Sequence, residues 1–372
     1  MTTKYNRIPD TFRELIAIDS PSYGERNLCD ALKSKLTELG VSCSEDDAGA
    51  KIGGNCGNLS AFVRGGIPGA PILLSAHLDT VEPSSGKAAV IDGDKVVSNG
   101  TAVLGADDVA GLTIILETIT RLKETNTAHR GIELLLPVAE EKYGAGSSVF
   151  DYGKIQAKEA YILDLGGEIG EAANAAPTIF SFSVDITGKA AHAGFAPGSG
   201  IHAIQTAANA IVKLPSGAPD SGLTFNVGTI HGGTANNIVP YSCRVTGEIR
   251  SLEHAAVLRY WEYVKSVFEG EARISGASVD FVSKAEIIAY RVAESSPVAR
   301  RFIHACETVG IRANIHSTLG GSDNNNFALH GIDGLVIACS MHDVHSTREY
   351  ALLSEMEQCV ELLTAILTEE ST

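Results

Sequence analysis

The chain has 372 residues, with 29 lysines and arginines against 45 aspartates and glutamates, so its formal net charge is −16. Because a single hydrophobic core seldom grows past about 250–300 residues, this length favours two domains. The acidic excess disfavours binding to nucleic acid or to anionic membranes, which attract clustered lysine and arginine. No apolar run approaches the roughly 18–20 residues that span a bilayer, and residues 1–12 lack the apolar stretch of a secretory signal. We therefore expect a cytoplasmic protein with no nucleic-acid or membrane partner.

The cysteines agree with that compartment. There are seven of them, none in a C-x-x-C pair. Small secreted proteins normally use an even number of cysteines as a disulfide framework. We therefore expect free thiols.

The first part of the chain alternates predicted helices and strands. Apolar residues recur at helical spacing over 9–39, which predicts a pair of helices. Short apolar runs at 71–76, 131–137 and 160–164 are typical of strands buried on both faces, and a helical stripe begins near Asp108. This order favours an α/β domain with a central mixed, mostly parallel sheet flanked by helices.

The pattern changes between residues 177 and 290. Strands are predicted at 178–186, 223–230, 242–249 and 279–290, and helices at 201–214 and 252–268. This βαββαβ order favours a small α+β domain with a four-stranded sheet and two helices. A helix at 298–309, a strand at 334–339 and a helix at 354–367 then resume the first pattern. We interpret 177–290 as a lid domain inserted into a catalytic domain formed by 1–176 and 291–372.

Polar side chains follow four of the predicted strands and begin one helix. They are His77 with Asp79, the pair Asp107 and Asp108, the pair Glu140 and Glu141, Asp164, and His345. Each motif alone is equally well explained as a solvated loop or an acidic helix start. Because the carboxyl ends of parallel strands meet at one edge of a sheet, we expect the motifs to form one cluster there. Imidazole and carboxylate ligands without thiolates suit two divalent ions that share a carboxylate.

In this order, the motifs resemble those of a known enzyme family. H-x-D, G-A-D-D, a Glu-Glu pair, a strand-end Asp and a late H-x-x-x-E are similar to the M20 family of co-catalytic zinc peptidases, in its peptidase T-like branch of tripeptide aminopeptidases. The resemblance covers nearly the whole chain. It implies a metallopeptidase that removes the N-terminal residue from short peptides, tripeptides in particular. It also implies two divalent ions per subunit, zinc first and cobalt or manganese as alternatives.

The resemblance also assigns the metal ligands. One ion would be held by His77 and Asp164, the other by Glu141 and His345, and Asp107 would bridge both. Spacing alone does not decide between Asp107 and its neighbour as the bridge. The family pattern further implies a cis peptide after the bridging aspartate.

Two more residues of the cluster receive roles through the resemblance. Asp79 would support the His77 imidazole. Glu140 would be the general base, taking a proton from the metal-bridging water and passing it to the leaving amine. Val109 and Ala139 depart from the family pattern, but neither is a proposed ligand.

Substrate contacts are expected from the insert and from one loop after it. His192 resembles the family's lid histidine, which stabilises the oxyanion, often in the site of a partner subunit. Asn236 would donate to the scissile carbonyl oxygen, and Arg250 would bind a carboxylate. Gly321 and Ser322 lie in a loop that would hold the free carboxylate of the substrate through backbone N–H groups. A homodimer through the lid domain is implied as well.

Two alternatives stay open. Another amide hydrolase of the same scaffold, such as an aminoacylase, a carboxypeptidase or a dipeptidase, would use the same ligands. A non-catalytic metal- or peptide-binding protein would be free to lose the base, whereas Glu140 is present. No G-x-S-x-G elbow and no phosphate-binding loop occurs in the sequence.

Overall fold

The computed structural model describes residues 7–369. They divide into two compact units. Unit 1 holds the described residues up to Ala175, then Arg291–Thr318, and those from Ser322 onward, and unit 2 holds Ala176–Tyr290 with Leu319–Gly321. The predicted boundaries, 177 and 290, differ chiefly in leaving 319–321 in the catalytic domain. The described residues exclude 1–6, which belong to the segment expected to lack a secretory signal. They also exclude 370–372, which were predicted to belong to the catalytic domain.

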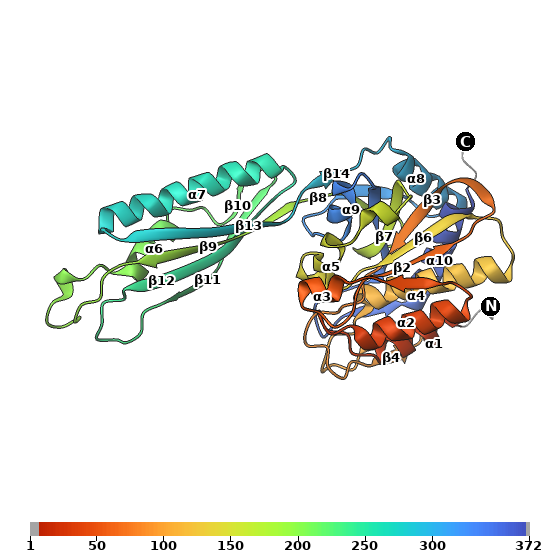
Figure 1. The fold of residues 1–372 in the computed structure, drawn as a ribbon, viewed down its shortest axis with the longest axis horizontal. Coiled ribbons are helices and arrows are strands. Elements are labelled where there is room, and N and C mark those ends of the chain that lie inside the picture. Colours follow the sequence, from red (N-terminus) through yellow and green to blue (C-terminus); the bar gives the residue numbers. More distant parts are fainter. Residues whose placement is uncertain (1–6, 370–372) are drawn as a thin grey trace. The chain divides into compact units, whose positions relative to one another are not determined.

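Unit 1 is built on a mixed sheet (Figure 1). Its strands are β1 (Cys43–Glu45), β2 (Leu59–Val63), β3 (Ile67–Ser75), β6 (Arg130–Leu136), β7 (Glu159–Gly166), β8 (Glu171–Ala176), β15 (Asn314–Ser317) and β16 (Asp333–Met341). The spatial order is β1-β2-β6-β3-β7-β16-β8-β14, where β14 is Tyr290–Arg291, and β15 also pairs with β8. The four central strands β6, β3, β7 and β16 are parallel to one another. The pairs β1 with β2, β2 with β6, and β8 with β16 are antiparallel.

Helices cover this sheet. They are α1 (Arg7–Ile16), α2 (Arg26–Glu38), α3 (Ala48–Ile52), α4 (Ala106–Glu124), α5 (Ala145–Ser148), α8 (Pro297–Val309), α9 (Asn324–Leu329) and α10 (Leu353–Thr368), with 3-10 turns η1 (Glu140–Lys142) and η2 (Tyr152–Lys154). In β3, Leu73 joins a core with Phe150 and Phe327, while Ile72 and Leu74 are buried on the opposite face. Both faces are therefore covered, and the prediction of a mostly parallel sheet flanked by helices is confirmed.

Unit 1 also contains a small sheet that the sequence did not predict. Its strands are β4 (Ala89–Asp92), β5 (Lys95–Ser98) and β17 (Tyr350–Leu352), in the order β17-β5-β4. Each of these strands is only three or four residues long. Strand β4 is largely exposed, so no alternation of buried apolar residues marks it in the sequence. The chain enters unit 1 again from unit 2 through β14 (Tyr290–Arg291).

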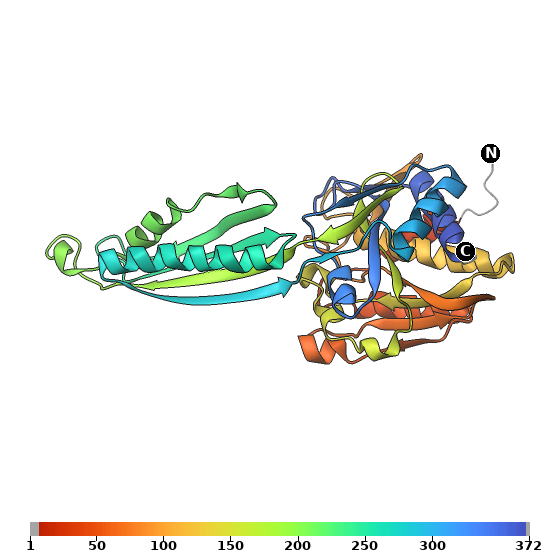
Figure 2. The same cartoon turned by 90° about the horizontal axis from the view of Figure 1, so that it is seen from above.

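Unit 2 has one antiparallel sheet with two helices on one face (Figure 2). Its elements are β9 (Thr178–Thr187), β10 (Gly217–Asp220), β11 (Leu223–Gly232), β12 (Ser242–Ser251), β13 (Ser278–Ile287), α6 (Ala203–Ile211), α7 (His254–Ser275) and the 3-10 turn η3 (Pro197–Ser199). Alternate residues of β9, from Phe180 to Ile186, pack with Ala207 of α6 and with Trp261 and Phe268 of α7.

The sheet of unit 2 has five strands in the order β10-β11-β12-β9-β13, whereas four were predicted. The additional strand, β10, has the sequence Gly-Ala-Pro-Asp and therefore none of the usual strand signals. It forms a hairpin with β11 across Ser221 and Gly222, whose φ of +76° suits glycine. Pro219 is tolerated because β10 lies at the edge of the sheet.

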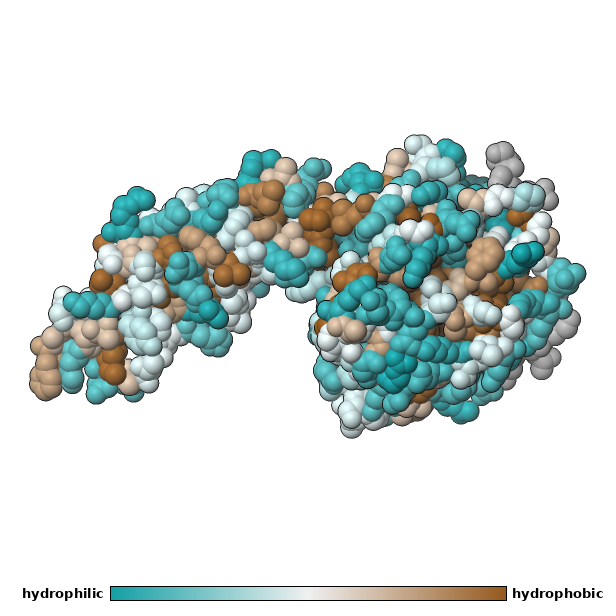
Figure 3. Space-filling model, viewed as in Figure 1, coloured by the Kyte–Doolittle hydropathy of each residue, from teal (hydrophilic) through white to brown (hydrophobic). Residues whose placement is uncertain are grey.

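Within residues 7–369, no helix combines the length and apolar character needed to cross a membrane. The face of each unit that Figure 3 shows carries both hydrophilic and hydrophobic residues. All seven cysteines are free thiols, as expected.

Candidate metal centre

The predicted cluster assembles at one edge of the sheet of unit 1. His77 lies two residues beyond β3, Glu140 and Glu141 form η1 after β6, and Asp164 lies in β7. His345 follows β16, with a left-handed φ of +59°. These strands are the four parallel ones, so their carboxyl ends share an edge.

One half of the cluster forms around His77. Its Nε2 lies 2.9 Å from Asp107 Oδ1 and 3.9 Å from Asp164 Oδ1. The potential ligand atoms of these three residues lie within 4.8 Å of one another. His77 is 2% exposed, so this half is shielded from bulk water.

The other half forms around His345. Its Nε2 lies 3.1 Å from Asp107 Oδ2 and 2.9 Å from Glu141 Oε1. Asp107 thus directs one carboxylate oxygen to each histidine, and it belongs to both groups of potential ligands. That arrangement is the one expected of a carboxylate shared by two ions.

Asp108 has a different environment from Asp107. Its Oδ2 accepts the backbone N–H of His77 at 3.0 Å, and its Oδ1 accepts the N–H of Gly111 at 3.1 Å. The peptide between Asp107 and Asp108 is cis, as the family pattern implies. Both oxygens of Asp108 are therefore engaged with backbone groups, whereas those of Asp107 face the histidines.

The carboxylates of the cluster strongly perturb one another. Burial and then the charge of Asp107 raise the pKa of Asp164 well above its usual value, and burial and then Asp164 do the same for Glu140. Contacts with Asp107 and Glu141 raise the pKa of His345 to about 10. A cation bound here would relieve this crowding of negative charge.

The donor set suits two zinc-type ions. Each group offers one imidazole nitrogen and carboxylate oxygens, with no thiolate. Mixed nitrogen and oxygen ligands of this sort are used by catalytic zinc and also accept cobalt and manganese. The residues present therefore fit two ions, with His77, Asp107 and Asp164 around one and Asp107, Glu141 and His345 around the other.

Comparisons with known proteins agree with this chemistry. Residues 58–178 match the model described as peptidase family M28, and residues 174–275 match the peptidase dimerisation domain of the M20 peptidases. A crystal structure of the aminopeptidase PepT from Bacillus cereus is 37% identical, with each chain covered over 97% and a TM-score of 0.91. The chain belongs to the M20 peptidases, in their peptidase T-like branch. It is an enzyme, a peptidase of the aminopeptidase type.

Two further relatives extend over the same length as this M20 peptidase. The crystal structure of a tripeptidase from Staphylococcus aureus is 28% identical, covers 97% of both chains and has a TM-score of 0.94. The uncharacterised protein YqjE from Bacillus subtilis is 34% identical over 363 residues, which are 98% of each chain. Because coverage is nearly complete, the likeness includes both units.

Asp79 lies behind the metal cluster of this M20 peptidase. Its Oδ1 is 3.4 Å from His77 Nδ1 and accepts the backbone N–H of Glu140 at 2.8 Å. Its Oδ2 accepts the N–H of Glu141 at 3.2 Å and the hydroxyl of Ser22 at 2.7 Å. Asp79 is fully buried, so one carboxylate lies beside the His77 imidazole and accepts hydrogen bonds from the turn that carries the Glu-Glu pair.

Sequence reasoning missed two buried glutamates that also hold this region. Glu349 accepts the N–H of Gly105 at 2.7 Å and that of Asp107 at 3.0 Å, so it fixes the start of α4. Glu25 accepts the N–H of Ala139 at 3.0 Å. Glu349 stood in the H-x-x-x-E motif without a role, whereas no spacing in the sequence marks Glu25.

His192 lies in unit 2 on an exposed turn. Its Nδ1 accepts the N–H groups of Gly194 and Phe195 at 3.1 and 3.2 Å, and its ring packs on that of Phe195. Because Nδ1 is an acceptor, the neutral imidazole carries its proton on Nε2. Nε2 is thus the atom that can donate a hydrogen bond.

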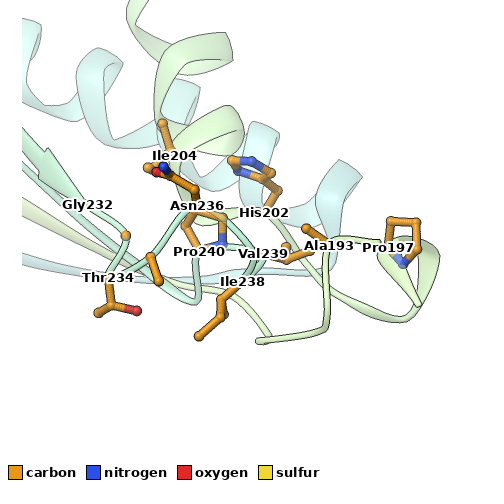
Figure 4. Close-up of a pocket in the computed structure, with 12 residues that line it drawn as sticks. Ala193, Pro197, His202, Ile204, Gly232, Thr234, Asn236, Ile238, Val239 and Pro240 are labelled. Carbon is orange, nitrogen blue, oxygen red and sulfur yellow. The ribbon is translucent and has the colours of Figure 1, made fainter. Parts of the chain in front are cut away.

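Asn236 and Arg250 also lie in unit 2. Asn236 lines a pocket of about 580 Å³ together with His202, Ile204 and Pro240 (Figure 4). The Arg250 guanidinium is already occupied in part, because Nε and Nη2 donate to Glu248 at 2.8 and 3.1 Å. Its Nη1 donates to the carbonyl of Leu319 at 3.0 Å.

The loop with Gly321 and Ser322 differs in part from expectation. The N–H of Ser322 donates to Asn325 Oδ1 at 3.1 Å, so this donor is not open to a substrate carboxylate in the present conformation. Its hydroxyl accepts the N–H of Asn324 at 3.3 Å. A Cβ on Gly321 would lie 2.1 Å from Ile287 Cδ1, so a larger residue here would require the Ile287 side chain to shift.

Proposed function

We propose that this M20 peptidase is a two-metal aminopeptidase that releases the N-terminal residue of tripeptides. One observation carries the metal assignment: Asp107 directs one oxygen to His77 and the other to His345, within two groups of potential ligands. Zinc is proposed for both ions, with cobalt and manganese as alternatives that the same ligands accept. The tripeptidase of Staphylococcus aureus supports the choice of substrate.

Glu140 is proposed as the general base. It is 9% exposed and lies next to Glu141, and one of its carboxylate oxygens lies within 4.8 Å of a ring nitrogen of His77. Bound metal ions would polarise the scissile carbonyl and lower the pKa of water. Burial and the charge of Asp164 raise the pKa of Glu140, which favours its holding the proton taken from the attacking water. Glu140 then passes that proton to the leaving amine.

Residues of unit 2 are proposed to bind the substrate. His192 would donate from Nε2 to the oxyanion, because its Nδ1 already accepts two backbone N–H groups. Asn236 would donate to the scissile carbonyl oxygen. Arg250 and the loop of Gly321 and Ser322 would bind the carboxylate end, after exchange of their present partners Glu248 and Asn325.

The variant Glu140→Ala tests the base. It should lower kcat by about two to four orders of magnitude, in line with the loss of a general base. The two ions should remain bound because Glu140 is not one of the proposed ligands. Elemental analysis of the same preparation checks the metal content. A Glu140→Ala variant that keeps near-normal turnover would refute the mechanism.

Substrate choice is tested with one set of related compounds. Initial rates are compared for a tripeptide, the dipeptide lacking its last residue, and the tripeptide acetylated at its N-terminus. An aminopeptidase specific for tripeptides cleaves the first and loses most activity on the other two. A faster reaction of the acetylated compound would indicate an aminoacylase or a carboxypeptidase instead.

A homodimer through unit 2 is also proposed, supported by the match of residues 174–275 to the peptidase dimerisation domain. Sedimentation velocity over a range of concentrations tests it. A species of 78 kDa, twice the 39.0 kDa chain, is expected, and a single 39.0 kDa species at all concentrations would contradict it.

A further inference from the structure

The turn that carries Glu140 and Glu141 is held by two buried carboxylates. Three successive backbone N–H groups donate to them: that of Ala139 to Glu25 at 3.0 Å, and those of Glu140 and Glu141 to Asp79 at 2.8 and 3.2 Å. Hydrogen bonds to charged acceptors are stronger than those between neutral groups. The backbone on either side of the Glu140 Cα is thus fixed from outside the turn.

The Glu25 carboxylate accepts hydrogen bonds from backbone N–H groups. It is 0% exposed and lies just before α2, and its Oε1 also accepts the N–H of Tyr23 at 2.9 Å. Its Oε2 is buried without a hydrogen-bond partner. Since burying a carboxylate is costly, a residue with such incomplete hydrogen bonding indicates a function beyond stability.

The backbone conformation of Ala139 is one that needs stabilisation by groups outside the turn. Its φ of +51° lies in the left-handed region, which costs a residue with a Cβ roughly 1–2 kcal/mol. Ala139 immediately precedes Glu140, so its backbone angles set the direction in which the Glu140 side chain leaves the turn. The N–H that Glu25 accepts belongs to this strained residue.

We propose that Glu25 is a positioning residue, which holds Ala139 in its left-handed conformation and thereby orients Glu140 and the proposed metal ligand Glu141. The hydrogen bonds that Glu25 accepts come from the backbone N–H groups of Ala139 and Tyr23, so it acts on the turn through the backbone. The inference rests on the proposed function, in which Glu140 is the base and Glu141 binds one ion.

Three substitutions of Glu25 separate hydrogen bonding from charge. Glu25→Ala removes the acceptor, and Glu25→Asp keeps the charge but is one methylene too short to reach Ala139. Both should lower kcat by about 10–100-fold with KM changed much less, the range seen when groups behind a metal site are removed. Glu25→Gln keeps an amide oxygen that can accept the same two N–H groups, so it should retain kcat within about threefold of wild type.

Glu133→Ala is the matched control. Glu133 is also a buried carboxylate, 5% exposed, and it accepts backbone N–H groups of Gln156 and Ala157 at 2.8–3.0 Å. None of these residues belongs to the metal cluster. Its loss should lower the melting temperature without lowering kcat.

A second readout does not depend on turnover. Calorimetric titration of zinc into metal-depleted protein should show weaker binding of one of two ions in Glu25→Ala and Glu25→Asp, and two wild-type affinities in Glu25→Gln and Glu133→Ala. If the wild-type protein binds two ions but cleaves no peptide, the proposed function is wrong. The zinc affinities of the Glu25 variants still test the positioning role of Glu25 in that case. Wild-type kcat and affinities in Glu25→Asp, or equal losses in Glu25→Gln, would overturn the inference. Should Glu25→Ala not fold, the comparison of Glu25→Asp with Glu25→Gln decides.

Discussion

At the scale of single residues, Asp107 is the point on which the cluster depends. Its two oxygens lie 2.9 Å from His77 Nε2 and 3.1 Å from His345 Nε2, so it contacts both halves. The two histidines are not equivalent, because His77 is buried and His345 is exposed on its outer side. Loss of Asp107 should therefore affect both ions, and loss of His345 chiefly one.

Metal content measures that difference. Asp107→Ala should retain less than one ion per chain after dialysis, and His345→Ala about one, because ligand loss weakens binding in proportion to the contacts removed. Asp280→Ala, an exposed aspartate of unit 2, should keep two ions. Elemental analysis of the three variants and wild type provides the test. Two tightly held ions in Asp107→Ala would show that the carboxylate is not shared.

The sequence could predict the cluster and the place of Asp79 beside it, but not the two buried glutamates that also hold this region. His77, Asp107 and Asp164 stood out because each lies at the end of an apolar run or the start of a helix. Glu25 and Glu349 did not, because their partners Ala139 and Gly105 are 114 and 244 residues away in the chain. A buried glutamate that binds distant backbone groups looks, in the sequence, like any surface glutamate.

At the scale of elements, prediction succeeded where burial produces a pattern. The second half of β3, most of β6 and the centre of β7 are buried on both faces and have the sequence of apolar runs. Strand β8, Glu-Ala-Ala-Asn-Ala-Ala, also lies in this sheet and is mostly buried, but its composition is typical of a helix. Pairing with β15 and β16 overrides that local preference.

Helix α2 and strand β1 are joined by one ion cluster. Glu45 of β1 is bound by Arg26 and Lys33 of α2 and accepts the N–H of Gly57 at 2.9 Å. The Arg26 hydrogen bond, with the help of Lys33 and Gly57 and against the effect of burial, lowers the pKa of Glu45 to about 2. Because the folded pKa is below the unfolded value, this stability is present above about pH 4.5 and is lost as the pH falls through about 2.

The variant Glu45→Gln tests this linkage. At pH 7 its free energy of unfolding should be lower than that of wild type by about 1–3 kcal/mol, the order implied by the pKa difference for a side chain that is 19% exposed. The difference should shrink between pH 4.5 and pH 2. Urea unfolding of both proteins with chelator present measures it. Asp30→Asn, which removes an exposed partner of Arg26, should change stability far less, and a difference independent of pH would contradict the prediction.

At the scale of the whole molecule, the two units differ in what stabilises them. The proposed metal ligands all belong to unit 1, whereas the core of unit 2 consists of apolar side chains from its own sheet and two helices. Ions that bind only the folded form of unit 1 raise its stability in proportion to their affinity and concentration. Unit 2 gains nothing directly from them.

The single tryptophan makes this difference measurable. Trp261 is 5% exposed in the core of unit 2, so its fluorescence reports the unfolding of that unit. A chelator should lower the midpoint temperature of the unfolding of unit 1, followed by far-UV circular dichroism. The midpoint temperature of the Trp261 fluorescence change should stay within about 2 °C of its value without chelator. Equal shifts of both midpoints would show that the units unfold together.

The contact between Asp107 and His345 spans 238 residues, and all of unit 2 lies between them in the chain. A ribosome adds about 5–20 residues per second, so roughly 10–50 s pass between the synthesis of these two side chains. Unit 2 has nearly all of its sheet and core within one continuous segment and can fold during that interval. The proposed metal cluster cannot form until His345 has left the ribosome. If His345 is a ligand as proposed, the nascent chain therefore cannot act as a peptidase before the residues that follow His345 begin to be made.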